Sequence, residues 1–582
     1  MAITAAALDG ADNITHLAPY KKRGDFRIFE AENSVTPKVE ISNIEITNYL
    51  FQIDQAGQDD FWDAHTNPIL PRVVPLSRLA GMRTAIEAVA RDSVNRTLSA
   101  NDGDDEECPS EAEPPSVVTF CTAVSEAFIA LDQRVQIARE RGIIPYDMIA
   151  MVLRPGDEVA IKVGDDLIGS RVLRAEMIES LFGEYIDIRY SVIAFNGKGF
   201  VSLERSCHVW PYDGARSFDE LPIRLLDKAT KGILTQRGQA YVELVSTPHY
   251  VQYTGSIVRQ SYWANSSYRA DGRAMIDVMT LQRIDPNYYS DLRLQSHQDA
   301  VASVSRDRLF MCDAVVYGFS LAAKKWGNFR IEAISPIQFR KDALEKLVLD
   351  DRRKAMVTAL VRHSKGSFAD IVDGKGGGCI FLLHGKPGVG KTLTAEAVAE
   401  YLEKPLYSVS VGELGTDPAS LEASLREILD VATSWDAVVL LDEADIFLEA
   451  RNERDIVRNA MVGVFLRLLE YHQGVLFLTT NRVRNFDPAF HSRISVALSY
   501  DDLEGQARET VWRNLLKAAG ITSIEDAGIK DLASRQINGR QIKNAIRIGH
   551  TLAKEDNGGV VTMRHILEPI ELANEFMATL RT

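Results

Sequence analysis

The chain contains few of the residues that build extracellular frameworks or metal centres. Only five of its 582 residues are cysteine, and no two of them form a C-x-x-C pair. An odd number of scattered cysteines does not suit a disulfide scaffold or a structural zinc site. This cysteine usage predicts a protein of a reducing compartment.

Leader segments and long apolar runs are also missing. The first sixteen residues, MAITAAALDGADNITH, lack a basic region ahead of an apolar core, so neither a secretory nor a mitochondrial signal is expected. The best candidate for a membrane span, Val117 to Leu131, is broken by hydroxyl and acidic side chains and predicts an amphipathic helix instead. The expected location is cytoplasmic, with the nucleus as the alternative, and no transmembrane anchor is expected.

Basic residues are fewer than acidic ones, with 66 Lys and Arg against 81 Asp and Glu, which gives a net charge of −15. Proteins that bind the nucleic-acid backbone usually carry the opposite balance, so nucleic acid is not an expected partner. The hydrophobic share of 46% is that of a globular protein. The length predicts about three or four folding units.

Composition changes divide the first part of the chain. Residues 1–44 are weakly periodic and predict a flexible arm, and residues 45–100 predict a partly helical segment. Residues 101–116, NDGDDEECPSEAEPPS, are acidic and rich in proline. Such a stretch cannot bury enough apolar surface to offset the entropy of ordering it, so it predicts a disordered linker.

Residues 117–340 predict a β-rich N-terminal domain. Short alternating runs separated by turn residues are typical of strands; they lie at 158–163, 185–193, 239–245 and 273–280. The stretch 318–348 predicts a last strand followed by a connecting helix. Four aromatic residues in it are expected to dock this domain onto the next one: Phe319, Trp326, Phe329 and Phe339.

Strands and helices alternate from 341 to 505, which predicts a parallel sheet flanked by helices. Residues 506–582 are predicted to be a helical lid domain. The fold class is therefore an α/β core with a C-terminal helical lid, preceded by a β-rich domain.

A phosphate-binding loop lies at the start of the α/β core. Residues 385–392 read GKPGVGKT and fit G-x-x-x-x-G-K-T, a loop whose backbone N–H groups wrap the phosphates of a nucleotide. Lys391 is predicted to reach the β- and γ-phosphates, and Thr392 to bind Mg²⁺. The predicted nucleotide-binding residues are Gly385, Lys386, Pro387, Gly388, Val389, Gly390, Lys391, Thr392 and Leu393. The core is thus a P-loop NTPase core.

A second motif supplies carboxylates. Residues 438–445 read VVLLDEAD, an apolar strand that ends in adjacent acids. Asp442 is predicted to hold Mg²⁺ together with Thr392, since Mg²⁺ takes oxygen ligands. Glu443 is predicted to be the base that polarises the attacking water. Both motifs together predict an ATPase whose ligands are ATP and Mg²⁺.

Residues 365–555 resemble an AAA-type ATPase module, with a large α/β domain and a helical lid. More closely, residues 145–575 resemble uncharacterised fungal AAA proteins that carry a β-rich N-terminal domain of unknown function. The resemblance is carried by GFSLAAKKW, DIVDGKGGGCIFLLHGKPGVGKTLTAEAVAE, TTNR and GRQIKNAIR.

The resemblance implies further site residues. Asn481 would orient the lytic water, and Arg540 would act as the second sensor in the lid. Arg493 would be the arginine finger that acts on ATP held by a neighbouring subunit, with Arg482 and Arg484 as the next candidates. The family has two arginines in an R-P-G-R run, whereas this chain reads SRIS at 492–495. Ile371 and Val372 fall where the family contacts adenine.

The resemblance also implies a homo-oligomeric ring, a hexamer, that remodels a protein partner recognised by the β-rich domain. Threading members carry an aromatic–aliphatic–Gly loop, but residues 410–416 read SVGELGT without an aromatic residue. Leu414 and Gly415 are left as candidates to line a narrower pore. One alternative is a nucleotide-controlled scaffold or assembly switch without threading. A weaker alternative is a nucleic-acid motor or loader.

Overall fold

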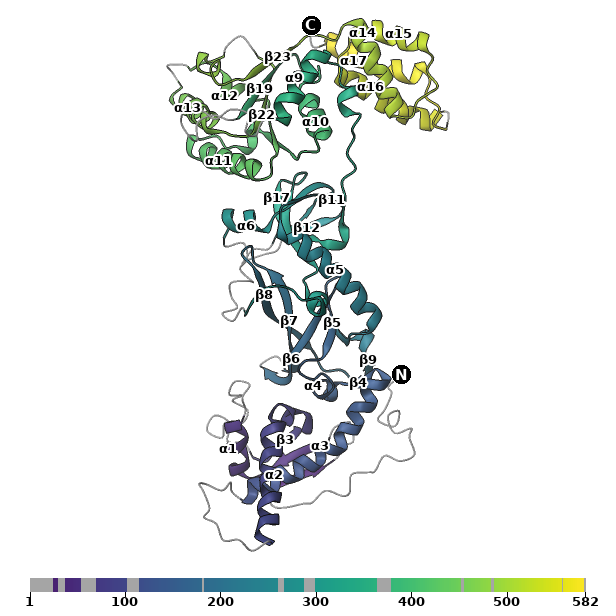
Figure 1. Cartoon of the computed structure of the whole chain (residues 1–582). Coiled ribbons are helices and arrows are strands. Elements are labelled where there is room, and N and C mark those ends of the chain that lie inside the picture. The colour runs from purple at the N-terminus through teal and green to yellow at the C-terminus, as the bar shows by residue number, and fades with distance from the viewer. Residues whose placement is uncertain are drawn as a thin grey trace.

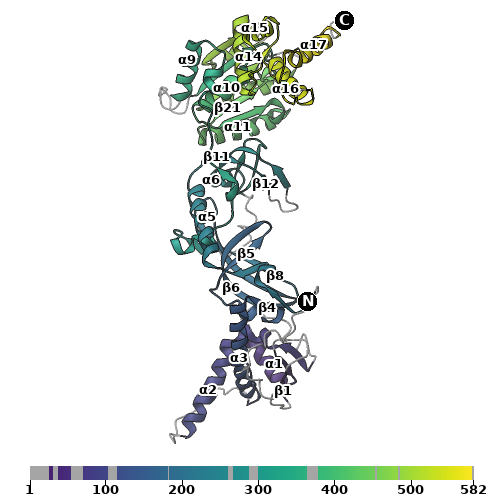
Figure 2. The ribbon, with the colours of Figure 1, turned by 90° about the vertical axis from the view of Figure 1, so that its right-hand side faces the viewer.

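The computed structural model describes residues 25–29, 37–53, 70–101, 115–180, 183–259, 266–286, 299–363, 378–451, 455–482, 486–556 and 558–579. Its folded parts follow one another along an elongated molecule, with the N-terminal sheet at one end and the α/β core with its lid at the other (Figure 1). The view turned by 90° shows the same serial order (Figure 2).

A small antiparallel sheet forms near the N-terminus. It has the order β1-β2-β3, with β1 at Phe26–Phe29, β2 at Lys38–Ile41 and β3 at Arg72–Pro75. The prediction of a flexible arm over residues 1–44 is therefore wrong for the two strands that it contains. Four-residue strands give only two alternations each, which is too short a pattern to recognise. Residues 1–24 lie outside the described residues.

Helices cover this small sheet: α1 (Ile44–Ile53), η2 (Leu76–Met82), α2 (Arg83–Asn101) and α3 (Pro115–Arg141). Of the predicted linker at 101–116, residues 102–114 lie outside the described residues. Its last two residues already belong to α3, since Pro suits the first turn of a helix.

In the described part of the chain, α3 is the one helix long and apolar enough to cross a membrane by length and composition alone. One face of α3 is buried in a core shared with the small sheet and the following β domain. The buried residues on that face are Val117, Phe120, Cys121, Val124, Ala127, Phe128, Leu131, Val135 and Ala138. A core helix passes the same test, so this helix is weak evidence for a span.

The β-rich region is confirmed, but it consists of two sheets. The first has the order β10-β5-β6-β7-β8-β15. Its strands are β5 (Glu158–Val163), β6 (Asp166–Ser180), β7 (Gly183–Phe195), β8 (Phe200–Val209), β10 (Ile223–Leu225) and β15 (Asp299–Val301). A separate strand pair joins β4 (Ile143–Pro145) to β9 (Ala215–Ser217).

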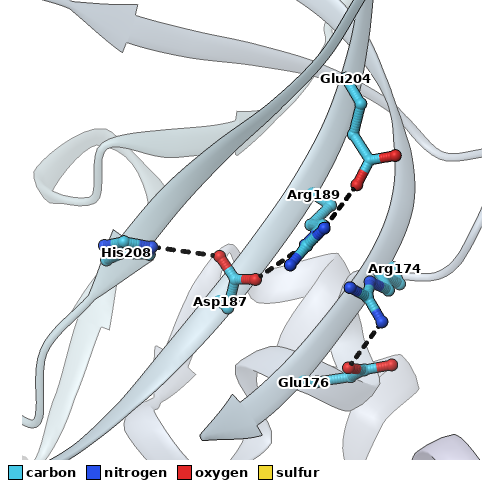
Figure 3. Close-up of polar contacts among 6 residues, drawn as sticks. All are labelled: Arg174, Glu176, Asp187, Arg189, Glu204 and His208. Atoms are coloured by element: carbon cyan, nitrogen blue, oxygen red, sulfur yellow. Dashed lines mark hydrogen bonds and ion pairs between the residues drawn. The ribbon is translucent and has the colours of Figure 1, made fainter. Parts of the chain in front are cut away.

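One face of this sheet carries a row of ion pairs across β6, β7 and β8 (Figure 3). The Arg189 guanidinium lies 3.1 Å from the Asp187 carboxylate and 2.9 Å from that of Glu204. His208 Nε2 lies 3.2 Å from Asp187 Oδ1, and on β6 Arg174 contacts Glu176. The arginines and carboxylates lie side by side on the same or neighbouring strands, so their charges neutralise one another.

The second sheet is seven-stranded, with the order β13-β12-β17-β16-β14-β11-β18. Its strands are β11 (His249–Tyr253), β12 (Ser256–Arg259), β13 (Ser266–Arg269), β14 (Gly272–Ile276), β16 (Val315–Ser320), β17 (Lys325–Arg330) and β18 (Ile334–Ser335). The stretch 318–348 begins with strands of the β16–β17 hairpin, so the predicted strand is present, but the predicted connecting helix is wrong for most of its length. Only the single turn α8 (Ala343–Lys346) is α-helical there.

The strand predicted at 239–245 is wrong, because these residues belong to the helix α5 (Lys228–Ser246). Leu234, Tyr241 and Val245 are buried on one side of α5, at helical rather than alternating spacing. The run predicted at 273–280 combines β14 with the start of the helix α6 (Val278–Ile284).

The α/β core is confirmed as a five-stranded sheet of order β20-β21-β22-β19-β23, all pairs parallel. Its strands are β19 (Cys379–Gly385), β20 (Leu406–Ser410), β21 (Val438–Asp442), β22 (Val475–Thr480) and β23 (Val496–Tyr500). Its helices are α9 (Asp351–Arg362), α10 (Lys391–Tyr401), α11 (Pro418–Ser434), α12 (Asp445–Leu448) and α13 (Ile456–Tyr471). The central strands read as apolar runs because helices cover both faces.

The predicted helical lid consists of α14 (Gly505–Ala518), α15 (Asp526–Ser534), α16 (Gly539–Asp556) and α17 (Met563–Thr579). These helices pack around a core of their own, which includes the fully buried Trp512.

Aromatic side chains join the seven-stranded sheet to the α/β core. The Phe319 ring stacks on Tyr407 at 5.3 Å between centroids, and Trp326 contacts Trp435 at 5.8 Å. Trp435 also donates its indole N–H to Asp277 Oδ2 at 2.7 Å. The predicted docking role of Phe319 and Trp326 agrees with these contacts.

The other two predicted docking aromatics differ from each other. Phe329 packs on Tyr253 within the seven-stranded sheet and does not make this link. Phe339 lies under the Arg273 guanidinium, at 4.9 Å from its ring centroid. Arg273 in turn forms an ion pair of 2.8 Å with Glu400 at the end of α10.

Candidate nucleotide site

The phosphate loop connects β19 to α10, at the carboxyl edge of the parallel sheet. Gly388 and Gly390 have φ angles of +79° and +103°, a left-handed conformation that glycine adopts without steric cost. The N-terminal end of α10 points its free N–H groups toward the loop, which favours an anion there. The loop is therefore built to hold phosphate.

Lys391 lies buried at the centre of the site, with 7% of its surface exposed. Its Nζ donates to Gly385 O at 2.7 Å, to Lys386 O at 2.8 Å and to Asn481 Oδ1 at 2.7 Å. Burial lowers the pKa of Lys391, and the carboxylates of Asp442 and Asp445 oppose that shift. The structure thus brings together the predicted lysine and Asn481, which are 90 residues apart.

Hydroxyl and carboxylate oxygens converge beside Lys391. Asp442 Oδ1, at the end of β21, accepts hydrogen bonds from Thr392 Oγ1 at 3.2 Å and from Thr479 Oγ1 at 2.5 Å. Hard oxygen donors of this kind suit Mg²⁺. The predicted pair Thr392 and Asp442 is therefore in direct contact, and its chemistry fits the metal.

Glu443 has a φ angle of +57°, unusual for a residue with a side chain. Such a conformation costs on the order of 1–3 kcal/mol and tends to occur at active sites. The Glu443 N–H donates to Thr479 Oγ1 at 3.0 Å, which holds this backbone. No role of its own was expected for Thr479 from the sequence. The only hint in the sequence is its position near a strand end, two residues before Asn481.

The lid meets the phosphate loop directly. Gly539 N donates to Gly388 O at 3.0 Å, and a Cβ at Gly388 would lie 2.8 Å from the Asn538 side chain. Arg540, in the first turn of α16, is near enough to lower the pKa of Lys391. The predicted second sensor therefore lies close to the predicted phosphate ligand.

Arg493 is held within its own chain. Its guanidinium contacts Glu470 Oε2 at 2.9 Å, Ala489 O at 2.9 Å and Leu466 O at 3.2 Å. The alternative finger Arg482 is exposed. Arg484 lies outside the described residues, as do the predicted adenine contacts Ile371 and Val372.

Most residues of the segment at 410–416 are exposed, but two of them, Glu413 and Leu414, contact the rest of the protein. Leu414 is fully buried, so the expectation that it lines a narrow pore is wrong. Glu413 accepts hydrogen bonds from Lys324 Nζ at 2.5 Å and from Ser410 Oγ at 2.8 Å. Because Lys324 belongs to the β16–β17 hairpin, this segment is tied to the seven-stranded sheet.

Two family models match the chain. The model of the ATPase family associated with various cellular activities (AAA) matches residues 381–501, which include the phosphate loop and the acids after β21. The model of a domain of unknown function (DUF7025) matches residues 134–230, from the end of α3 to the start of α5.

Curated relatives match over a similar region. The chain is 28% identical to ATPase family AAA domain-containing protein 3B of Homo sapiens over 185 residues, 30% of this chain and 27% of that protein. It is 24% identical to an ATP-dependent zinc metalloprotease FtsH of Syntrophotalea carbinolica over 196 residues, 32% and 30% of the two chains. It is 26% identical to ATPase family AAA domain-containing protein FIGL1 of Arabidopsis thaliana over 177 residues, 28% and 26%. The chain spans less than a third of the length of these relatives.

Proposed function

Because residues 381–501 form an AAA ATPase domain, we propose that the chain binds ATP between its phosphate loop and Asp442 and hydrolyses it with Mg²⁺. The observation that carries this proposal is the convergence of Lys391, Thr392, Asp442 and Asn481 on one point of the sheet edge. Mg²⁺, when bound, neutralises charge on the phosphate oxygens.

Each residue of the site has a distinct role in this proposal. Lys391 uses all three of its N–H groups on protein oxygens, and these donors would turn to the phosphates. Thr392 and Asp442 would hold the metal. Glu443 would take the proton of the attacking water, which Asn481 orients. Arg540 would report the γ-phosphate to the lid.

We further propose that the active form is a homo-oligomeric ring, a hexamer, in which Arg493 completes the site of a neighbouring copy. The family relation supports the ring. In the single chain Arg493 is bound to Glu470, so this role requires the ion pair to open or reorient when copies assemble.

The leading functional hypothesis is remodelling of a protein partner that the β-rich region recognises. The alternative is a nucleotide-controlled scaffold or assembly switch. The buried Leu414 and the Lys324–Glu413 ion pair favour the alternative, because a segment held in this way is not free to grip a chain. A nucleic-acid motor is the weakest candidate, given the net charge of −15.

A Glu443→Gln variant tests the proposed chemistry. It should bind ATP with unchanged affinity, while turnover falls by about 10²–10⁴-fold because the base is lost. Lys391→Ala should lose ATP binding itself. Glu575→Gln, on the exposed end of α17, is the matched control and should behave as the wild type. Undiminished turnover in Glu443→Gln would refute the assignment of the base.

The Glu443→Gln variant also separates the two hypotheses. Held in ATP, it should retain a protein partner if remodelling is the function, and that partner should stimulate the wild-type ATPase. If the protein is an assembly switch, no partner should be retained and none should stimulate the ATPase, while ATP should change the sedimentation coefficient of the protein on its own. Salt-sensitive binding to DNA would instead support the nucleic-acid motor.

A further inference from the structure

One buried residue of β22 contacts three successive residues at the end of β21. The Thr479 side chain is 1% exposed. Its hydroxyl donates to Asp442 Oδ1 at 2.5 Å and accepts the N–H of Glu443 at 3.0 Å. Its carbonyl accepts the N–H of Ala444 at 2.9 Å.

These contacts lie where the regular pairing of the two strands ends. The last paired residues of β21 and β22 are Leu441 and Leu478. Beyond this point Glu443 turns into its left-handed conformation. The Glu443 N–H donates to the Thr479 hydroxyl, so a side chain rather than strand pairing holds the backbone at Glu443.

The Thr479 hydroxyl donates one hydrogen bond, to the Asp442 carboxylate, and accepts another, from the Glu443 N–H. A carboxylate oxygen can only accept, and a backbone N–H can only donate. A hydroxyl does both at once, which an aliphatic side chain of the same shape cannot do. Thr392 also donates to Asp442, but it is itself a proposed metal ligand.

We propose that Thr479 is a positioning residue that sets the metal-binding carboxylate of Asp442 and the backbone of Glu443 through one hydroxyl. The proposal rests on the ATPase function proposed above and deepens it, since it links the metal ligand to the base. The adjacent Thr480 serves another group: its hydroxyl bonds the Asp445 carboxylate and the Arg482 backbone. The two threonines therefore have separate roles.

The test is a Thr479→Val variant, which keeps the shape of the side chain and removes the hydroxyl. Binding of a non-hydrolysable ATP analogue is titrated with Mg²⁺ and, separately, measured in EDTA. Residues that hold a metal ligand typically contribute 10–100-fold to metal affinity or activity. The Mg²⁺ midpoint should rise by about tenfold or more, while the dissociation constant in EDTA stays within about twofold of wild type.

Thr479→Ser retains the hydroxyl and should restore the Mg²⁺ midpoint. Thr358→Val is the matched control, because Thr358 is also buried but bonds only Lys354 O on α9 among the described contacts. It should match the wild type in both titrations. If Thr479→Val does not fold, Thr479→Ala is judged by the same two measurements.

An unchanged Mg²⁺ midpoint in the folded Thr479→Val protein would overturn the proposal. Equal weakening of binding with Mg²⁺ and in EDTA would also overturn it, because that result indicates a general structural role. Absence of ATP binding in the wild type would contradict the proposed ATPase function instead, so the two failures are distinguishable.

Discussion

Lys391 connects the phosphate loop to the end of β22. Its ammonium group bonds two loop carbonyls and the Asn481 side chain. In the proposed function an incoming phosphate would compete for these donors, which would couple nucleotide binding to the position of Asn481 at a single side chain. Burial among fixed dipoles makes such contacts stronger than they would be in water.

His472, between α13 and β22, predicts a pH effect on stability. Burial lowers its pKa to about 4 from the ordinary value of 6.5. Below pH 6.5 the unfolded chain therefore binds a proton that the folded chain does not, and stability falls as the pH falls. Between pH 7.5 and 6.0 the loss should be about 0.8 kcal/mol.

Calorimetric melting at these two pH values checks the His472 prediction. In a His472→Gln variant the difference in the free energy of unfolding between the two pH values should shrink by about 0.8 kcal/mol. The control is His491→Gln, a change at an exposed histidine. It should keep the wild-type difference in the free energy of unfolding between the two pH values. An unchanged pH dependence in His472→Gln would contradict the prediction.

At the scale of the elements, helix α10 connects the proposed nucleotide site to the contact between the ATPase domain and the seven-stranded sheet. It begins at Lys391, and near its end Glu400 accepts hydrogen bonds from Arg273 of β14 and from the Arg340 backbone. A helix of this length is a stiff rod of roughly 16 Å. Helix α10 therefore links the phosphate loop physically to the seven-stranded sheet.

The contact between α11 and α6 can be tested at Trp435. A Trp435→Phe variant keeps an aromatic ring but leaves the buried Asp277 Oδ2 without its donor. The free energy of unfolding should fall by about 1–3 kcal/mol, the cost of an unpaired buried acceptor. Calorimetry should show the ATPase domain melting at a lower temperature.

Trp512 in the lid provides the control for Trp435. It is fully buried, and its indole nitrogen makes no hydrogen bond in the described structure. Trp512→Phe therefore loses ring volume but no hydrogen bond. A loss in Trp435→Phe no larger than in Trp512→Phe would show that the bond to Asp277 contributes nothing.

The whole molecule is a series of folded parts, in which the DUF7025 region lies between the N-terminal sheet and the seven-stranded sheet (Figure 1). The seven-stranded sheet and the adjoining α6 contact the ATPase domain through aromatic stacking, the hydrogen bond between Asp277 and Trp435, and the ion pairs at Glu400 and Glu413. Movements of the ATPase domain would therefore reach the DUF7025 region through this sheet.

If Arg493 acts on the nucleotide site of a neighbouring copy, two variants that are each inactive should restore ATPase activity when mixed. Arg493→Ala should reduce turnover by about 10³-fold or more, the contribution of such arginines in related phosphoryl transfer. Lys391→Ala should be inactive because it binds no ATP. A mixture should regain partial activity, since an intact Arg493 can then act on an intact site of a neighbouring copy.

Steady-state ATPase assays at several mixing ratios measure this complementation. Each variant mixed with wild type provides the reference for subunit exchange. A mixture no more active than the sum of its components would exclude action of Arg493 between subunits. Full activity of Arg493→Ala would leave Arg482 and Arg484 as the candidates for the arginine finger.

The sequence by itself determined the phosphate loop, the acids at the end of β21 and the alternation of strands and helices in the α/β core. These features are local: eight consecutive residues specify the loop, and apolar runs specify strands that are buried on both faces. The same local signals misled where patterns were short, as in β1 and β2, or ambiguous, as in α5. A few residues of alternation fit a strand and one side of a helix equally well.

Only the tertiary structure decided which distant residues meet. Thr479 reaches Asp442 across 37 positions and Arg273 reaches Glu400 across 127. Burial of Leu414 removed a candidate pore residue, and the Glu470 ion pair placed Arg493 against its own chain. The physical reason is that strand register and domain docking are set by the packing of whole surfaces, which no short stretch of sequence contains.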